Sequence, residues 1–262
     1  IEALMPDGKA LQMGTSHNLG QNFAKTFGVK FLDRDSKEQV AWQNSWGMST
    51  RLIGALVMVH SDNKGLVLPP KVAPAKAVIV PILFEDSKKK VLENAMQLSG
   101  QLVEFGAFVD ARDNYSAGWK FNEWELVGVP LRIEIGPKDI AKKQAVIVRR
   151  DTGEKRTVSI SAVKKEVSKA LEQMQRDMFL KAKKFLAQNT VEANNWPDFA
   201  KAIGERKLVL APFCEQKDCE EKIREKTTAT SRCIPFNQKN AKLVCVQCQN
   251  SAQRKSFFAK AY

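Results

Sequence analysis

The spacing of apolar residues in the middle of the chain predicts alternating strands and helices. Three short apolar runs are typical of buried strands, at 76–84, 107–113 and 129–136. The run from 85 to 105 has helical spacing instead, and Gly106 ends it. Its apolar face consists of Val91, Leu92, Ala95, Leu98, Leu102 and Phe105. With a second helix at 120–128, this order predicts a small α/β unit with a mixed sheet.

The same reasoning applies to the flanking segments. A strand is expected at 29–33, and the dense apolar stretch that follows Thr50 predicts a buried helix. Three prolines then interrupt regular structure between 69 and 74, where we expect a domain boundary. Four more elements are predicted beyond the α/β unit: a hairpin at 145–160, helices at 161–189 and 194–203, and a strand at 207–213.

Composition narrows the class of protein. The 262 residues suffice for about two ordinary domains. No apolar stretch is long enough to cross a membrane, and the N-terminus lacks the basic and apolar regions of a signal peptide. The formal net charge of +13 has two interpretations. Excess lysine can serve solubility, or it can attract a polyanionic partner such as nucleic acid.

The five cysteines all lie in the last fifth of the chain, and four of them have the spacing of a metal site. Cys214 and Cys219 form a C-x4-C pair, and Cys245 and Cys248 form a C-x2-C pair. Two such pairs can hold one structural zinc ion in a tetrahedron, and zinc lets a segment with a small core fold. Ordinary free cysteines are the alternative. Cys233 lies between apolar neighbours and is predicted to be a packed thiol.

Acidic, basic and aromatic residues gather between 113 and 139. Arg132 and Lys138 can donate hydrogen bonds to base edges, and Glu125 and Asp139 can accept them from base amino groups. Such groups beside aromatic rings suit unstacked, single-stranded bases. The alternative is a sheet edge with solvated charges.

A second candidate site lies near the N-terminus. The stretch from Gln12 to Phe23 gathers small, hydroxyl and amide residues around His17. Arg51 follows two hydroxyl residues at the start of a predicted helix, an arrangement that suits phosphate. The alternatives are a surface arginine and a hydrogen-bonded structural histidine.

Four stretches strongly resemble prolyl-tRNA synthetases: GTSHNLGQNFAKTF, QNSWGMSTRLIGALVMVHSDNKGLVLPP, NYSAGWKFNEWELVGVPLRIEIGPKD and RRDTGEK. The pattern PFC…DC…CIPF…CVQC…AY at the end resembles the eukaryotic/archaeal type of this class II family, although some relatives have a closer second cysteine pair. The resemblance covers essentially the whole chain and implies an α/β and α+β multidomain protein. It implies three parts: the C-terminal part of an antiparallel-sheet catalytic domain at 1–70, an α/β anticodon-binding domain at 75–156, and an α+β zinc-binding domain at 160–262.

The resemblance also implies roles for single residues. Arg51, in the motif 3 sequence TRLIG, is the expected catalytic residue and binds the phosphates of ATP. The other residues expected at ATP are Gln12, Thr15, Ser49 and Thr50. Those expected to border proline are His17, Ser45, Trp46 and Gly47. Those expected to read the tRNA anticodon are Glu125, Arg132, Lys138 and Asp139. The C-terminal carboxylate, on Tyr262, is expected to lie towards the active site.

The activity implied is Mg²⁺- and ATP-dependent formation of prolyl-adenylate from proline, followed by transfer of the prolyl group to proline tRNA. A cytoplasmic homodimer without a membrane partner and with a structural zinc ion is expected. Class II motifs 1 and 2 do not occur in the chain, so we expect it to be inactive without an N-terminal half of the same enzyme. Two other interpretations are a non-catalytic tRNA- or RNA-binding module with the synthetase fold, and a zinc-stabilised interaction protein. The ligand wall between Gln12 and Arg51 favours the enzyme, because an RNA-binding module has no need of it.

Overall fold

The structure is a computed structural model that describes residues 1–236, 238 and 242–262. Its residues form two compact units, one of Leu56–Lys184 and the other of Ile1–Ala55 together with Phe185–Tyr262. Within the described residues, none of the helices is both long and apolar enough to span a membrane.

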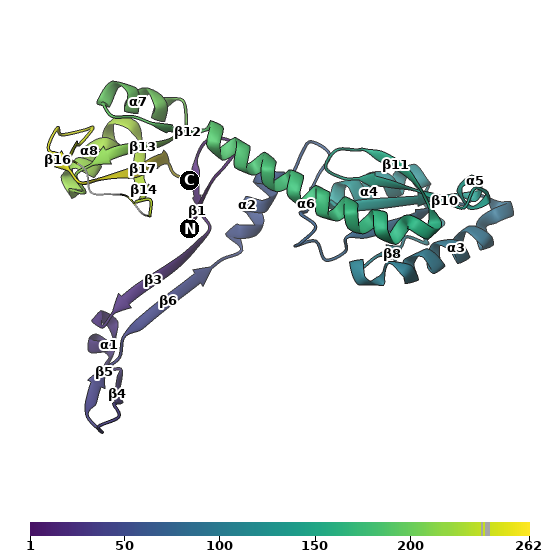
Figure 1. Ribbon diagram of the computed structural model, residues 1–262, viewed down its shortest axis with the longest axis horizontal. Helices are drawn as coiled ribbons and strands as arrows, with labels where there is room; N and C mark the ends of the chain where they lie inside the picture. Colours follow the sequence, from purple (N-terminus) through teal and green to yellow (C-terminus); the bar gives the residue numbers. More distant parts are fainter. Residues whose placement is uncertain (237, 239–241) are drawn as a thin grey trace. The chain divides into compact units, whose positions relative to one another are not determined.

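The unit Leu56–Lys184 is built on one mixed sheet with the strand order β11-β10-β9-β7-β8. Its strands are β7 (Ala77–Pro81), β8 (Phe108–Val109), β9 (Leu131–Ile135), β10 (Gln144–Arg149) and β11 (Lys155–Ser159). β7 runs parallel to β8 and β9, whereas β10 is antiparallel to both of its neighbours. Its helical elements are η1 (Glu85–Ser87), α3 (Lys88–Gln101), η2 (Val103–Phe105), α4 (Ala117–Val127), α5 (Pro137–Ala141), η3 (Ile160–Ala162) and most of α6 (Val163–Gln188) (Figure 1). The predicted α/β unit with a mixed sheet is confirmed.

Helices cover the two faces of this sheet unequally. On one face, α3 and the first half of α6 pack against strand residues such as Ile79, Ile133 and Ile147. On the other face, α4 packs through Phe121 and Trp124 on β7, which leaves β9, β10 and β11 without a helix in that core cluster. The alternation of strand side chains therefore produces one face covered by α3 and α6, and a second face that carries Arg132 and Glu134 beside α4. We call this second face the open sheet face; Arg132 and Glu134 are largely buried on it.

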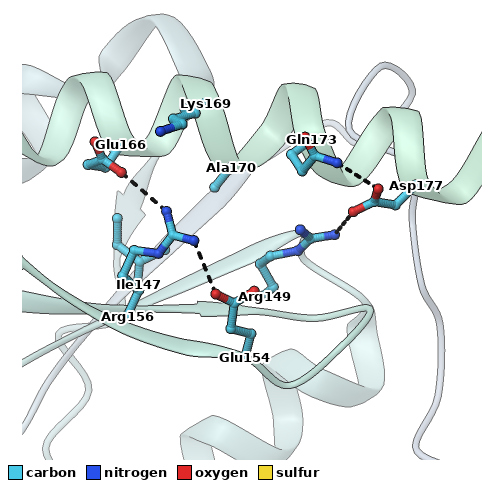
Figure 2. Close-up of a pocket in the computed structure, with 9 residues that line it drawn as sticks. All are labelled: Ile147, Arg149, Glu154, Arg156, Glu166, Lys169, Ala170, Gln173 and Asp177. Atoms are coloured by element: carbon cyan, nitrogen blue, oxygen red, sulfur yellow. Dashed lines mark hydrogen bonds and ion pairs between the residues drawn. The ribbon is translucent and has the colours of Figure 1, made fainter.

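Ion pairs hold α6 over the β10–β11 hairpin. Figure 2 shows Arg156 reaching Glu154 and Glu166, and Arg149 reaching Asp177, around a cavity of 410 Å³. The compact unit extends past residue 160 to Lys184, because apolar residues of α6 complete the core of the sheet. The pattern of apolar residues found this helix but could not show which core it joins.

The second unit contains an N-terminal part and a C-terminal part. The N-terminal elements are β1 (Glu2–Leu4), β2 (Ala10–Gln12), β3 (Gly14–Gly20), α1 (Asn22–Phe27), β4 (Lys30–Leu32), β5 (Glu38–Val40), β6 (Gln43–Met48) and the start of α2 (Arg51–His60). β3 and β6 pair as a long antiparallel ribbon, with the β4–β5 hairpin beyond it (Figure 1). The predicted helix after Thr50 exists, but the expectation that it is buried is wrong, since only Ala55 of α2 is buried.

The C-terminal part is an α+β fold around the sheet β12-β13-β17-β14. Its elements are β12 (Thr190–Glu192), α7 (Trp196–Gly204), β13 (Leu208–Phe213), α8 (Lys217–Thr227), β14 (Ala229–Cys233), β15 (Leu243–Val244), β16 (Ser251–Ala252) and β17 (Arg254–Lys260). Phe199, Phe213 and Phe258 form edge-to-face ring contacts at the centre of its core. The Asn195 side chain caps α7, and Pro197 lies in its first turn, where a missing N–H costs nothing.

Candidate functional site

Arg132 lies on the open face of the sheet in a cluster of charged and aromatic groups. Arg132 is on β9, donates to Glu134 at 2.8 Å, and its guanidinium lies 4.3 Å from the ring centre of Phe121. Lys155, from β11, brings its Nζ atom to 3.5 Å from the same Glu134 carboxylate. Glu134 is only 7% exposed, so its charge is compensated by two cations rather than by bulk water.

Glu134, Lys155 and Phe121 were not among the site residues predicted from the sequence. Arg132 and Glu134 are two residues apart on a strand, so they project from the same face. The register of the sheet then places Lys155 opposite Val148, which is itself opposite Arg132. The alternation of side chains in LRIEI could have predicted that Glu134 lies beside Arg132. The position of Lys155 could not be predicted in this way, because it depends on the pairing of β10 with β11.

The other residues predicted to read the anticodon surround this face. Glu125, near the end of α4, forms an ion pair with Lys64 at 3.2 Å. Lys138 and Asp139 lie in α5, which follows β9 directly. The carboxylate of Asp139 accepts hydrogen bonds from the Gly136 N–H at 3.0 Å and from Gln144 at 3.1 Å. Asp139 therefore also fixes the start of α5 and the start of β10.

The predicted ATP and proline residues lie on the β3–β6 ribbon and next to it. In the register of the ribbon, Thr15 is opposite Gly47, and His17 is opposite Ser45. These four residues share one face, because directly paired residues of an antiparallel ribbon project to the same side. Trp46 is opposite Ser16 and so projects from the other face. The structure therefore does not bring Trp46 together with the other three residues predicted to border proline.

Gly47 has a steric reason to be glycine. A Cβ atom at this position would lie 3.1 Å from Oγ1 of Thr15, closer than an ordinary van der Waals contact. Arg51 is the first residue of α2, and its N–H donates to the hydroxyl of Ser49 at 3.3 Å. Thr50 precedes it, Gln12 ends β2, and all of these side chains apart from Thr15 are exposed. The ribbon offers an open wall and not an enclosed pocket.

The four cysteines predicted to hold zinc come together in the C-terminal part. Sulfur atoms of Cys214, Cys219, Cys245 and Cys248 all lie within 4.8 Å of one another. The Cys219–Cys245 and Cys214–Cys248 sulfurs are 3.6 and 3.7 Å apart. Thiolates about 2.3 Å from a central ion in a tetrahedron are separated by about 3.8 Å, whereas disulfide sulfurs are about 2.05 Å apart. The donor set and its spacing therefore fit zinc.

Local backbone geometry makes this cluster possible. Glu215 and Gln249, which follow the first and the last of the four cysteines, have φ angles of 61° and 63°. Such left-handed residues turn the chain sharply directly after two of the four cysteines. Burial opposes ionisation of Cys245, but hydrogen bonds from the backbone of Cys248, Gln247 and Cys214 outweigh it and lower the pKa of the Cys245 thiol to about 7.

Cys233 is not the packed thiol that its apolar neighbours predicted. It is exposed, and the pairing of β14 with β17 is irregular between Ser231 and Cys233. This bulge breaks the alternation of the strand, so the apolar neighbours in the sequence do not determine which side Cys233 faces.

The C-terminal tyrosine packs against the N-terminal hairpin of the same unit. The ring of Tyr262 lies 4.8 Å from Nζ of Lys9, and its hydroxyl donates a hydrogen bond to Asp7. Burial raises the pKa of the Tyr262 hydroxyl, and the hydrogen bond to Asp7 raises it further. A parallel bridge joins Ala261 to Ala10 in β2, two residues before Gln12. The end of the chain is thus fixed next to the strand that carries a predicted ATP residue.

Comparison with known proteins gives matches in both units. Residues 76–170 match the anticodon-binding domain family, and residues 196–262 match the family described as prolyl-tRNA synthetase, C-terminal. A proline–tRNA ligase of Lachnoclostridium phytofermentans is 49% identical over the whole chain, which covers 54% of that protein. Proline–tRNA ligases of Natranaerobius thermophilus and Agathobacter rectalis are 47% and 50% identical, and the chain covers 55% of each.

The chain thus spans about half the length of the curated relatives it matches. These relatives are bacterial, so the similarity is not specific to the eukaryotic/archaeal type that the terminal cysteine pattern resembles. The open sheet face lies within the first matched domain, and the four-cysteine cluster lies within the second. Residues 76–170 are therefore similar to anticodon-binding domains, and residues 196–262 are similar to the C-terminal domain of prolyl-tRNA synthetases.

Proposed function

We propose that the chain is the anticodon-reading and C-terminal portion of a proline–tRNA ligase. The observation that carries this proposal is the similarity to proline–tRNA ligases along the whole chain, at 47–50% identity in three relatives. The complete enzyme then activates proline with ATP and Mg²⁺ and transfers it to proline tRNA. A cytoplasmic location follows from this activity, and a reducing compartment also keeps clustered cysteines available as metal ligands.

In this proposal, the open sheet face binds the anticodon. Arg132 and Lys138 supply donors to base edges, and Glu125 and Asp139 supply acceptors. Glu134 holds the Arg132 guanidinium by two hydrogen bonds, at 2.8 and 3.1 Å, so the arginine is oriented before RNA arrives. Such preorganisation reduces the entropy lost on binding.

The β3–β6 ribbon supplies one wall of the catalytic site. Arg51 stabilises the phosphate charge of ATP, and Gln12, Thr15, Ser49 and Thr50 lie on the nucleotide side of the wall. His17, Ser45 and Gly47 border proline from one face of the ribbon. The side chain of Trp46 projects from the other face of the ribbon. Its proposed contact with the proline substrate therefore lies at the edge of the ribbon.

The ribbon also gives a physical reason why the chain needs more of the enzyme for catalysis. A sheet of two strands is marginally stable in water, and three or more strands are usually needed. Trp46 and Met48 are 75% and 79% exposed, and Trp42 and Phe27 are each 73% exposed. Large apolar side chains exposed together mark a surface that another part of a protein covers. We assign this surface to the N-terminal half of the enzyme, which also supplies the interface of a homodimer.

The C-terminal domain is proposed to hold one structural zinc ion through Cys214, Cys219, Cys245 and Cys248. Bound there, the ion cross-links the chain after β13, the start of α8 and the turn after β15. Its role is to stabilise the fold, because all four ligands come from the protein and leave no position for substrate. Tyr262 is proposed to anchor this domain beside β2, with its carboxylate directed towards the active site.

The proposal is tested by separating activation from charging in the full-length enzyme. Arg132→Ala should lower the efficiency of tRNA charging by about 1–3 kcal/mol in transition-state free energy. Proline-dependent ATP–pyrophosphate exchange should be unchanged, because it needs no tRNA. Arg156→Ala is the matched control, since Arg156 lies on the sheet face covered by α6 and pairs with the carboxylates of Glu154 and Glu166.

Two outcomes would contradict the proposal. Equal losses of charging and exchange in Arg132→Ala would mean that Arg132 is structural. Absence of exchange in the wild-type full-length protein, with RNA binding retained, would favour the alternative of a non-catalytic tRNA- or RNA-binding module.

A further inference from the structure

Two aromatic rings and an arginine form a compact cluster where α4 begins. The rings of Tyr115 and Trp119 stack with their centres 3.9 Å apart and their planes 13° from parallel. The guanidinium of Arg112 lies 5.2 Å from the centre of the Tyr115 ring and 5.4 Å from that of Trp119. We call these three side chains the stacking platform.

Buried charges hold the platform in place. Arg112 donates to both carboxylate oxygens of Asp110, at 2.8 and 2.7 Å, and it also pairs with Glu123. Lys120, only 1% exposed, donates to the backbone carbonyl oxygens of Asp110 and Arg112. Two carboxylates and two cations balance within this network. The platform therefore lacks an excess of charge and is rigid.

The platform remains accessible although it is held firmly. Tyr115 is 39% exposed and Trp119 is 43% exposed, so a face of the stacked pair is open to solvent. The rings are not needed to cap α4, because the Ser116 hydroxyl already caps this helix by accepting a hydrogen bond from the Trp119 N–H. Capping therefore does not explain why the two rings are exposed. Two stacked rings that expose apolar surface offer a contact to another flat group.

The position of the platform relates it to the anticodon face. Phe121, two residues after Trp119 on α4, contacts Arg132 through its ring and its backbone carbonyl. Residues two apart on a helix project about 200° from each other, so Trp119 and Phe121 lie on different sides of α4. The platform also follows the carboxyl end of β8, and Lys138 follows the carboxyl end of β9. Both strands run parallel to β7, so these ends lie at the same edge of the sheet.

We infer that the stacking platform binds a nucleotide base of the tRNA that flanks the anticodon, while the three anticodon bases occupy the open sheet face. This inference rests on the proposed function and extends it to a second contact in the same domain. The platform and Lys138 lie at the same end of the sheet, so an RNA loop bound at Lys138 has the platform within the same domain face to extend to. Base stacking on aromatic side chains tolerates any base and does not need local positive charge.

The test uses the 262-residue chain and a synthetic anticodon stem-loop of proline tRNA. Trp119→Ala should raise the dissociation constant about 5- to 150-fold, the range measured for loss of one base–aromatic stack. Trp119→Phe, which keeps a ring, should retain most of the affinity, and Trp119→Leu, which keeps apolar bulk without a ring, should not. Phe179→Ala is the control, because Phe179 is a 61% exposed aromatic residue on α6 of the same unit.

Two further measurements distinguish stacking from loss of folding or loss of charge. 2-Aminopurine, placed in turn at each loop nucleotide outside the anticodon, should change fluorescence on binding at one position, and Trp119→Leu should abolish that change. The slope of log affinity against log salt should be the same in Trp119→Leu and wild type, because no phosphate contact is removed. A changed slope would overturn the inference.

The outcomes also separate this inference from the proposed function. If wild type does not prefer the proline stem-loop to one with an altered anticodon, the proposed function fails. If Arg132→Ala weakens binding and Trp119→Leu does not, the proposed function stands and the platform does not bind RNA. Loss of binding to a proline-rich peptide in Trp119→Leu, with RNA affinity unchanged, would assign the platform to a peptide and contradict us.

Discussion

Replacing Asp110 by asparagine should destabilise the unit Leu56–Lys184 more than its single charge suggests. Asp110 is 4% exposed and accepts hydrogen bonds from Arg112 and from the indole of Trp124. The bonds from Arg112, followed by that from Trp124, outweigh burial and lower the pKa of Asp110 from 3.8 to about 2. At about 1.4 kcal/mol per pH unit, this shift corresponds to about 2 kcal/mol of stability.

The full cost should exceed this figure. Asparagine leaves Lys120 buried near a neutral group, and breaking a buried ion pair from one side typically costs about 3–5 kcal/mol. Because the pKa of Asp110 is lowered on folding, its contribution is present above pH 3.8 and is lost as the pH falls towards about 2. The difference between wild type and Asp110→Asn should therefore shrink in acid.

Hydrogen exchange of β7 and β9 peptides measures the opening free energy of this unit apart from the rest of the chain. Asp113→Asn is the matched control, because the side chain of this neighbouring carboxylate is 61% exposed and pairs with the exposed Lys88. Exposed pairs of this kind contribute about 0–1 kcal/mol. A loss below about 1 kcal/mol in Asp110→Asn, or a loss that does not change between neutral pH and about pH 3, would refute the reasoning.

Two other predictions concern stability. Zinc removal by a strong chelator should unfold the C-terminal part, since structural zinc contributes about 10–16 kcal/mol in small zinc domains. Cys245→Ser should have the same effect, whereas Cys233→Ser, at an exposed cysteine, should not. Elemental analysis measures the zinc content, and hydrogen exchange over residues 196–262 measures the unfolding. Stoichiometric zinc in Cys245→Ser would contradict the ligand set. Arg149→Met removes ion pairs of 2.7 and 2.8 Å to Asp151 and Asp177. It should lower the free energy of unfolding by about 3 kcal/mol, which a lower midpoint of unfolding in urea would report. Lys169→Met, which removes a cation from the same cavity, should change it little, and equal effects of the two variants would show that only bulk in the cavity matters.

The middle of the chain was predictable because its local and tertiary signals agree. The apolar face of α3 was read from spacing, and Val91, Ala95, Leu98 and Leu102 are indeed buried. The five residues of β7 are all buried, as a continuous apolar run in a parallel sheet predicts. Here a single period determined both the type of element and the side that it buries.

Prediction was incomplete where pairing between distant strands determines the outcome. The sheet of the C-terminal part was not anticipated beyond β13, because β14 is polar, β17 is apolar only at Phe257–Ala259, and the partners of both strands lie far away in sequence. The convergence of the four cysteines was anticipated, since the spacing of thiols constrains a metal site directly. The position of Trp46 was not, because the register of the ribbon decides which face it occupies.

The central claim is that the open sheet face reads the anticodon of proline tRNA. The most direct test is the affinity of this chain for proline tRNA and for the same tRNA with its anticodon replaced, at one fixed salt concentration. We predict that wild type prefers the proline anticodon by about 10-fold or more, because each base contact contributes about 1–3 kcal/mol, and that Arg132→Ala loses most of this preference. Equal affinity of wild type for the two tRNAs would contradict the account.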